Sequence, residues 1–283
     1  MLTIGDYNTL RIVKMTKDGA AYLDGDGRDI YLPKEDLAAA NLRGKTRPGD
    51  TLKVFIYNDS RDSLKATTAK PAAKVGDFAA LTVKDVTDFG AFLSWGLPKD
   101  LFVPKKYIEG PLIPGDKAVV YLMLDYEKTG VIGTCKLDKN FTKDASALEE
   151  GQEVSLMVFD FSPLGASVVI DNTYRGLLYR DEIFEDLNVG DVKTGYIKKV
   201  REDGLIDAVL QPQNFPDANE QARDAIMKAL KQEDGFLPLH DKSDPDEIKK
   251  RLAMSKKLFK KAVGGLYKDG IINLEEKGIR LKG

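Results

Sequence analysis

The chain has 283 residues, 42% of them hydrophobic and 31% charged, and a formal net charge of −2. This composition is typical of ordinary globular domains, and the length allows two to four of them. The near balance of charge excludes a polybasic tail as the main source of any nucleic-acid binding. The single cysteine, Cys135, excludes an intramolecular disulfide, and the single histidine, His240, excludes a histidine-rich metal site.

Several classes of protein are not indicated by the sequence. No run of about eighteen apolar residues occurs, so we expect no transmembrane helix and no membrane partner. The first residues lack a basic segment followed by an apolar one, so no secretory signal is expected and the expected location is the cytoplasm. The chain has no P-loop, no Ser/His/Asp set and no acidic cluster with metal-ligand spacing. We therefore predict no cofactor, no metal site and no enzymatic activity.

A pattern of regularly spaced glycines occurs three times along the chain. It opens at Gly5-Asp6, Gly76-Asp77 and Gly151-Gln152. A further glycine follows each opening glycine after 14 residues, at Gly19, Gly90 and Gly165. A second Gly-Asp pair begins 44, 39 and 39 residues after the opening glycines, at Gly49, Gly115 and Gly190. This agreement at several anchors predicts three structural repeats.

Short apolar runs separated by Gly, Pro and Asp fill each repeat. In the second repeat the runs are 79–83, 91–94, 101–103 and 117–124. Each repeat also has a charged segment after its third run, where a helical turn fits. About five short strands in 65 to 70 residues are typical of an OB-type barrel. We predict three tandem five-stranded barrels, in residues 1–70, 71–145 and 146–213.

The pattern becomes helical after Asn214-Phe215-Pro216, which predicts a different domain in residues 214–283. The first predicted helix covers 218–232. Asp244 before Pro245 predicts the start of a second helix that ends at Leu252, and Ser255 predicts the start of a third that ends near Asp269. Two short strands, 271–274 and 279–281, then form a hairpin. Three helices followed by a hairpin predict a winged helix-turn-helix, so the fold class is mainly β with a C-terminal α+β domain.

The segment Val86-Thr87-Asp88-Phe89-Gly90-Ala91-Phe92-Leu93 in the second repeat resembles the S1 RNA-binding domain, a branch of the OB fold. Asp100-Leu101-Phe102-Val103 and Gly115-Asp116 extend the resemblance. Three such units followed by a winged helix are similar to the conserved virulence factor B family of bacterial RNA-binding regulators. The resemblance covers nearly the whole chain and implies RNA as the partner.

Aromatic side chains on a strand face stack with unpaired bases. The candidates are Phe89, Phe92 and Phe102 in the second barrel, with Phe102 facing either the surface or the core. By glycine spacing, the places of Phe89 and Phe92 hold Asp18 and Ala21 in the first repeat, and Leu164 and Ser167 in the third. The platform is therefore not carried by all three units: either Tyr22, Tyr31 and Tyr179 replace it in part, or those units are spacers or protein contacts.

Basic side chains supply candidate phosphate contacts. The first domain has 12 basic and 10 acidic side chains, a net charge of +2, and the second has 10 of each, a net charge of 0. The third has 6 basic and 13 acidic side chains, a net charge of −7, and the fourth has 15 and 12, a net charge of +3. The predicted contacts in the barrels are Lys84, Lys105, Lys106, Arg180, Lys193, Lys198, Lys199 and Arg201. In the last domain, Lys256, Lys257, Lys260 and Lys261 lie opposite the apolar side of the third helix, which reads nucleic acid in winged-helix proteins.

The resulting hypothesis is a protein that binds single-stranded RNA with limited sequence preference and acts in post-transcriptional regulation. One alternative is a DNA-binding transcriptional regulator that contacts duplex nucleic acid through the winged helix. Another is a protein-interaction scaffold whose barrels no longer bind RNA. The sequence makes no prediction of the oligomeric state.

Overall fold

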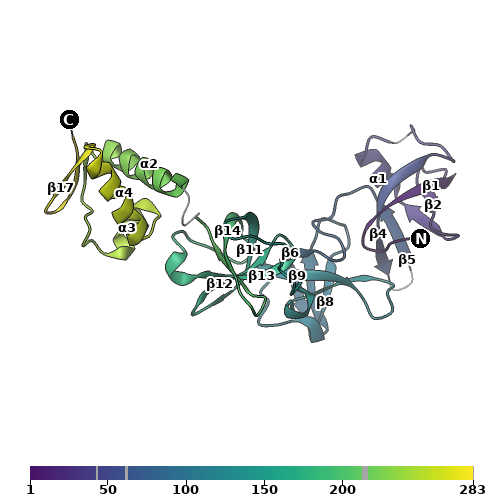
Figure 1. Ribbon diagram of the computed structural model, residues 1–283. Helices are drawn as coiled ribbons and strands as arrows, with labels where there is room; N and C mark the ends of the chain where they lie inside the picture. The colour runs from purple at the N-terminus through teal and green to yellow at the C-terminus, as the bar shows by residue number, and fades with distance from the viewer. Residues whose placement is uncertain (43, 61–62, 212–215, 283) are drawn as a thin grey trace. The chain divides into compact units, whose positions relative to one another are not determined.

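The computed structural model describes residues 1–42, 44–60, 63–211 and 216–282. Its elements are three small barrels in chain order and a C-terminal domain of helices with a small sheet (Figure 1). The chain divides into two compact units, Met1–Phe141 and Thr142–Gly283. The first unit holds two barrels and the second holds one barrel and the helical domain. The predicted boundary between residues 213 and 214 lies outside the described residues.

The three barrels share one topology. Each is closed, and its strands are hydrogen-bonded in the order first, second, third, fifth, fourth. The third and fifth strands run parallel to each other and the other neighbours run antiparallel. Each first strand contains a bulge, at 12–14, 83–85 and 158–160, in its pairing with the second strand. A bulge increases the local bend of a strand, as closure of so small a barrel requires.

Each barrel has five strands, and in barrel 2 the predicted runs 91–94, 101–103 and 117–124 match strands to within one residue, whereas the run 79–83 covers only part of its strand. Barrel 1 consists of β1 (Tyr7–Met15), β2 (Ala21–Asp24), β3 (Asp29–Leu32), β4 (Thr51–Ser60) and β5 (Ser63–Thr67). Barrel 2 consists of β6 (Phe78–Thr87), β7 (Gly90–Ser94), β8 (Leu101–Pro104), β9 (Lys117–Leu124) and β10 (Val131–Thr134). Barrel 3 consists of β11 (Glu153–Ser162), β12 (Gly165–Ile170), β13 (Tyr174–Tyr179), β14 (Val192–Val200) and β15 (Ile206–Val209).

The charged segment after each third strand forms the predicted helical turn. It is α1 (Lys34–Ala39) in barrel 1, η1 (Lys105–Tyr107) in barrel 2 and η3 (Arg180–Glu182) in barrel 3. A further short turn, η2 (Asp138–Asn140), follows barrel 2. The prediction of five strands with an intervening helical turn is confirmed in all three repeats.

The helical domain is a winged helix, as predicted, and it contains one additional strand that was not predicted from the sequence. It contains α2 (Pro216–Gln232), α3 (Pro245–Leu252), α4 (Lys256–Lys268), β17 (Ile272–Glu275) and β18 (Gly278–Leu281). Asp244 and Ser255 cap α3 and α4, as predicted, by accepting hydrogen bonds from backbone amides. The additional strand, β16 (Phe236–Leu237), pairs with β18 and makes the sheet three-stranded. Two residues are too few for an alternating pattern, so β16 reads as a loop in the sequence.

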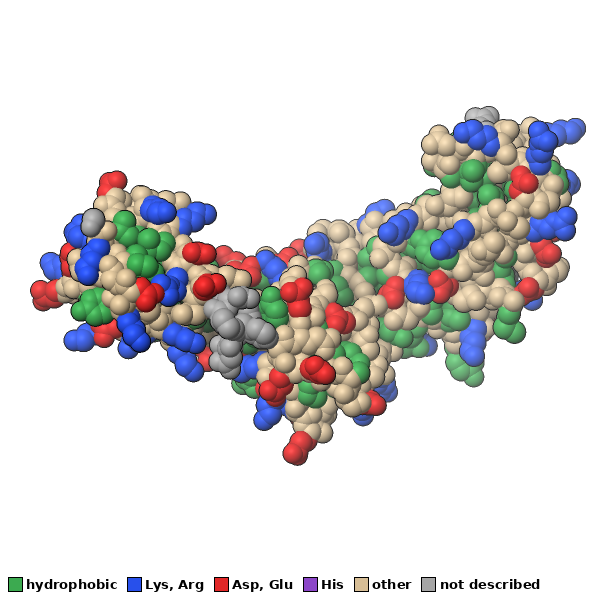
Figure 2. Space-filling view, turned by 45° about the horizontal axis from the view of Figure 1, so that its top comes forward, with side chains coloured by type: hydrophobic (Ala, Val, Ile, Leu, Met, Phe, Trp, Pro, Cys, Tyr) green, Lys and Arg blue, Asp and Glu red, His purple; other side chains and the backbone are tan. Residues whose placement is uncertain are grey.

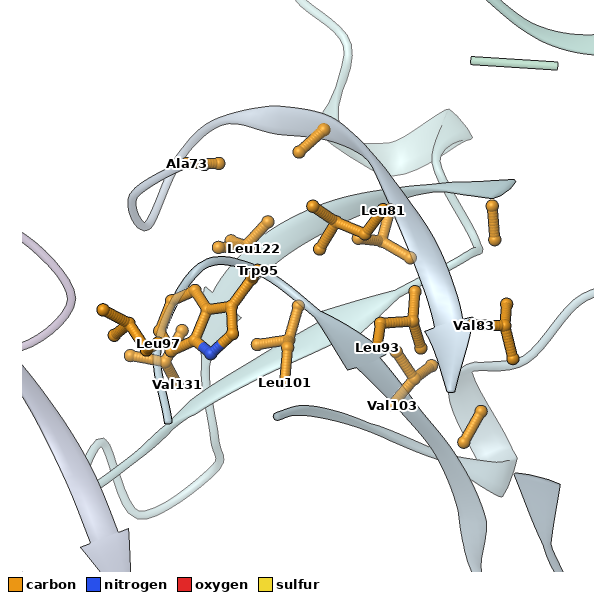
Figure 3. Packing of buried hydrophobic residues seen from close by; sticks show 14 of the residues in the cluster. Ala73, Leu81, Val83, Leu93, Trp95, Leu97, Leu101, Val103, Leu122 and Val131 are labelled. Atoms are coloured by element: carbon orange, nitrogen blue, oxygen red, sulfur yellow. The ribbon is translucent and has the colours of Figure 1, made fainter. Parts of the chain in front are cut away.

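The core of barrel 2 continues into barrel 1. Figure 3 shows Trp95 packed against Leu97, Leu101 and Val131 inside barrel 2. The same apolar cluster contains Phe55 and Tyr57 of β4, and both rings meet Trp95 edge-on, with centroids 5.9 and 6.4 Å away. Burial raises the pKa of Tyr57 to about 12, with nearby carboxylates acting in the same direction. Barrels 1 and 2 are therefore joined by shared apolar packing.

The single cysteine and the single histidine are both partly buried. Cys135 follows β10 and is partly buried, and this burial raises the pKa of its thiol. His240 is also partly exposed, and its Nδ1 accepts a hydrogen bond from the amide of Lys242 at 3.1 Å. Each helix among the described residues is too short or too polar to span a lipid bilayer.

Candidate nucleic-acid interface

Two phenylalanines form an aromatic pair on the outer face of barrel 2. Phe92 of β7 and Phe102 of β8 are direct cross-strand partners. Their ring centroids lie 5.1 Å apart and the ring planes are tilted by 37°. The neighbours Leu101 and Val103 are buried in the barrel, so strand alternation places Phe102 outside. The alternative of Phe102 as a core residue is therefore excluded, and a partly exposed aromatic platform remains.

Phe89 lies at the tip of the hairpin that precedes this platform. Its side chain is 82% exposed, and its carbonyl oxygen accepts a hydrogen bond from the amide of Lys105 at 2.8 Å. The adjacent Gly90 has φ of +156°, and a Cβ there would lie 2.2 Å from the carbonyl oxygen of Val103. Because only glycine permits this close approach, the tip stays against β8 and places Phe89 at the edge of the aromatic face.

A cavity of about 520 Å³ adjoins the aromatic pair. Phe92, Phe102 and Tyr107 are among the residues that line it. The hairpin between β9 and β10 contributes Tyr126, whose side chain is 97% exposed, and barrel 1 contributes Asn58. Neither Tyr126 nor Asn58 was predicted from the sequence, because Tyr126 follows a strand and Asn58 belongs to another repeat.

The lysines predicted around this face differ in their freedom to bind phosphate. Lys105 and Lys106 are exposed, and the Lys106 ammonium lies 4.8 Å from the ring centroid of Tyr107. Lys84 forms an ion pair with Asp100 at 3.1 Å. Lys99, near the same face, donates to the carbonyl oxygen of Asn58 at 2.8 Å, and burial lowers its pKa. Lys105 and Lys106 are the better candidates for phosphate contact.

Barrel 1 carries a matching aromatic pair. Tyr22 of β2 and Tyr31 of β3 are cross-strand partners, with ring centroids 5.6 Å apart and planes tilted by 58°. Ala21 pairs with Leu32 in the way that Ala91 pairs with Val103, so the counterpart of Phe92 is Tyr22. The assignment of Ala21 to that place by glycine spacing was wrong.

The cause of this error is a turn of different length. In barrel 1 the hydroxyl of Thr16 donates to the carbonyl oxygen of Ala20, four residues on. In barrel 2 the hydroxyl of Thr87 donates to the carbonyl oxygen of Gly90, three residues on. The turn in barrel 1 is therefore one residue longer, and one residue of slip exchanges the two faces of a strand. The alternation of Ala21, Tyr22 and Leu23 was the sequence signal for an outward Tyr22.

Barrel 3 has no aromatic pair at these positions. The counterparts of Phe92 and Phe102 are Ser167 and Leu177, which are cross-strand partners and are both buried. The exposed hairpin tip carries Leu164, whose carbonyl oxygen accepts from the amide of Arg180, as that of Phe89 does from Lys105. Barrel 3 therefore has the same backbone hydrogen bond at the hairpin tip as barrel 2, but it lacks the pair of aromatic rings on which a base would stack.

Several predicted cations of barrel 3 are held by carboxylates. Arg201 donates to Asp207 at 2.6 Å and to the hydroxyl of Tyr179 at 2.5 Å. The hydrogen bond to Asp207 is the main cause of the raised pKa of Arg201. The remaining ion pairs are Lys198 with Glu182 at 2.6 Å and Lys193 with Glu185. Among the described residues, Arg180 and Lys199 are exposed and have no ion-pair partner.

The lysines of α4 lie on the exposed side of the winged helix. Phe259, Ala262 and Leu266 are buried on the opposite side of the helix. Figure 2 shows Lys and Arg side chains over much of this domain, with acidic groups between them. Lys256 donates to the carbonyl oxygen of Ser243 at 2.8 Å. Exposed lysines remain along the helix at positions Lys257, Lys260 and Lys261.

Comparison with known proteins gives the class of these domains. A model of the S1 domain matches residues 4–69 and 75–136, and a model of the CvfB-like winged helix domain matches residues 224–281. S1 domains and winged helices are nucleic-acid-binding domains. The fold and the matches together define a multidomain nucleic-acid-binding protein.

Relatives match over nearly the full length. YitL of Bacillus subtilis is 30% identical over 280 residues, covering 96% of this chain and 91% of the relative. Conserved virulence factor B of Staphylococcus aureus is 27% identical over 289 residues, covering 98% of this chain and 94% of the relative. A solved multidomain protein with nucleic acid binding domains from Streptococcus pneumoniae is 27% identical, with a TM-score of 0.48 and coverage of 99% and 98%. The chain belongs to the conserved virulence factor B family.

Proposed function

We propose that this protein binds single-stranded RNA through the outer faces of barrels 1 and 2. The observation that carries the proposal is the cross-strand aromatic pair Phe92–Phe102, with the exposed Phe89 at its edge. Unpaired bases stack on such rings for about 1–3 kcal/mol each, with little dependence on sequence. Tyr22 and Tyr31 offer a second, smaller platform on barrel 1.

Phosphate contacts complete the proposed interface. Lys105 and Lys106 are exposed next to the aromatic face of barrel 2. Arg180 and Lys199 of barrel 3 and the exposed lysines of α4 are further candidates. The proposed role is binding, without catalysis, of cytoplasmic RNA in post-transcriptional regulation.

Duplex DNA is the second candidate ligand, because α4 carries exposed lysines and is the helix that enters the major groove in winged-helix proteins. The test is competition for a labelled 20-nucleotide single-stranded RNA, followed by fluorescence anisotropy. We expect unlabelled RNA of the same sequence to displace the label at concentrations at least about tenfold lower than duplex DNA of equal length. Stronger competition by the duplex would support a DNA-binding regulator, and absence of binding to either would support a protein-interaction scaffold.

Replacing Lys257, Lys260 and Lys261 of α4 together by alanine is expected to weaken RNA binding and its dependence on salt. Each phosphate contact on a single strand contributes about 0.7 to the slope of log affinity against log salt. The slope is therefore expected to fall by about 1 to 2 if two or three of these lysines contact phosphate. The measurement is a salt titration of the binding constant.

The matched control changes Lys74, Lys193 and Lys198, which lie outside α4 and each form an ion pair with a carboxylate. Its slope is expected to stay near that of the unchanged protein. Equal slopes for the two triple variants would contradict a role for α4 in phosphate contact.

A further inference from the structure

We infer that the cavity beside the Phe92–Phe102 pair is a pocket that selects one guanine base from the bound strand. The inference rests on the proposed binding of single-stranded RNA and adds a base preference to it. The cavity, of about 520 Å³, falls within the range of small-ligand sites. Its lining includes the rings of Phe92, Phe102 and Tyr107 together with three carboxylates, those of Asp100, Asp125 and Glu127.

The charges of this pocket favour a base edge over a phosphate group. Of its two lysines, Lys99 is bonded to the carbonyl oxygen of Asn58, which leaves Lys106 at the rim. Asp100 is paired with Lys84, and the carboxylates of Asp125 and Glu127 disfavour phosphate inside the pocket, so the backbone of the strand passes outside, along Lys105 and Lys106. Aromatic rings and carboxylate acceptors that line the same cavity suit a flat ring whose edge carries hydrogen-bond donors.

Glu127 is the carboxylate available to such a ring. Asp100 is paired with Lys84, and both oxygens of Asp125 accept from Thr129, at 2.8 Å from its amide and 3.2 Å from its hydroxyl. Among the described residues, Glu127 has no hydrogen-bond or ion-pair partner and its side chain is exposed. A free carboxylate beside an aromatic platform accepts two donors at once if they lie side by side.

The hairpin that carries Glu127 is held in place by barrel 1. The side-chain oxygen of Asn58 accepts from the amide of Val131 at 2.9 Å, and a Cβ at Gly130 would lie 2.6 Å from the Asn58 amide nitrogen. The turn itself closes through the amide of Asp125, which donates to the carbonyl oxygen of Gly130 at 2.9 Å. The pocket is thus shaped before the ligand arrives, which lowers the entropic cost of binding.

Guanine is the base whose donors match this acceptor. Its Watson–Crick edge presents a ring N–H and an amino N–H next to each other, and these align with the two oxygens of one carboxylate. Adenine and cytosine present one amino group beside a ring nitrogen that is itself an acceptor. Uracil presents one N–H between two carbonyl oxygens, which a carboxylate repels. The expected order of preference is guanine, then adenine and cytosine, then uracil.

The experiment compares four labelled ten-nucleotide RNAs: all uridine, and uridine with a single central guanosine, adenosine or cytidine. Fluorescence anisotropy at fixed salt gives the affinity for each. The guanosine RNA is expected to bind about tenfold more tightly than the all-uridine RNA, which is the usual value of a good bidentate contact. Trp95, the single tryptophan of the chain, lines the cavity, so its fluorescence is expected to change most with the guanosine RNA.

The decisive variant is Glu127→Gln, with Glu109→Gln as its control. Both changes remove one negative charge from an exposed side chain of barrel 2, but Glu109 lies outside the cavity. Glu127→Gln is expected to reduce the guanosine preference to about threefold or less, whereas Glu109→Gln keeps it. Equal affinity of the unchanged protein for all four RNAs, or a preference that survives Glu127→Gln, would overturn the inference while leaving the proposed function intact. Failure to bind any of the RNAs would overturn both.

Discussion

Replacing Phe92 by serine and Phe102 by leucine is expected to weaken the binding of single-stranded RNA by about 10- to 100-fold. The two changes remove the paired rings, and the loss of base stacking accounts for this range. Barrel 3 has serine and leucine at the equivalent cross-strand positions, in a barrel of the same topology. The double variant therefore introduces two side chains that a barrel of this topology already contains at these positions, so we expect it to fold. The measurement is fluorescence anisotropy with a labelled RNA, together with circular dichroism to check folding.

The control for this variant is Phe161→Ala, which removes an exposed aromatic ring of barrel 3 that belongs to no cross-strand aromatic pair. Its effect on affinity is expected to stay below about threefold, since a single surface side chain outside the interface contributes little. If Phe161→Ala and the double variant weaken binding equally, the aromatic face of barrel 2 is not the site.

Replacing Trp95 by alanine is expected to destabilise the first unit by about 3–5 kcal/mol, the usual cost of removing a large buried aromatic ring. Trp95 is only 3% exposed and meets Phe55 and Tyr57 of barrel 1 edge-on. Its indole N–H also donates to the carbonyl oxygen of Lys99 at 2.6 Å, so the change leaves that acceptor without its partner. Both barrels lose packing, because the ring lies in the apolar cluster that they share.

Urea unfolding followed by circular dichroism measures this loss. Trp95→Phe is the matched control and is expected to recover most of the stability, since it retains a ring against Phe55 and Tyr57. Phe259→Ala provides a second control for the loss of a buried aromatic ring. Phe259 lies in the core of the winged helix, so its removal leaves the packing of barrels 1 and 2 unchanged. An unchanged midpoint for Trp95→Ala would show that the junction does not stabilise the pair of barrels.

Local sequence patterns were sufficient to predict most of the helices and strands of this protein. The predicted runs 101–103 and 117–124 match β8 and β9 to within one residue. Asp244 and Ser255 marked the starts of α3 and α4, because a side-chain cap is made within a few residues of its own position. Such features depend on neighbours in the chain, so a single sequence suffices to predict them.

The candidate site depended on contacts between distant segments. The outward position of Phe102 and its pairing with Phe92 follow from the register of β7 and β8. Lys84, Lys193, Lys198 and Arg201 were selected for their charge, but each has a carboxylate partner that sequence composition does not reveal. A cation that is free and one that is paired look the same in a sequence.

The sequence by itself determined three barrels and a winged helix, because period-two alternation, glycine turns and helix caps are local signals repeated at a fixed spacing. The tertiary structure decided between Ala21 and Tyr22 as the counterpart of Phe92. The turn before this strand is one residue longer in barrel 1, and the cross-strand pairing then places Tyr22 opposite Tyr31. The tertiary structure also decided that Asn58 holds Val131, a residue 73 positions away. Contacts at such separation arise only when the packing of two barrels brings their backbones together.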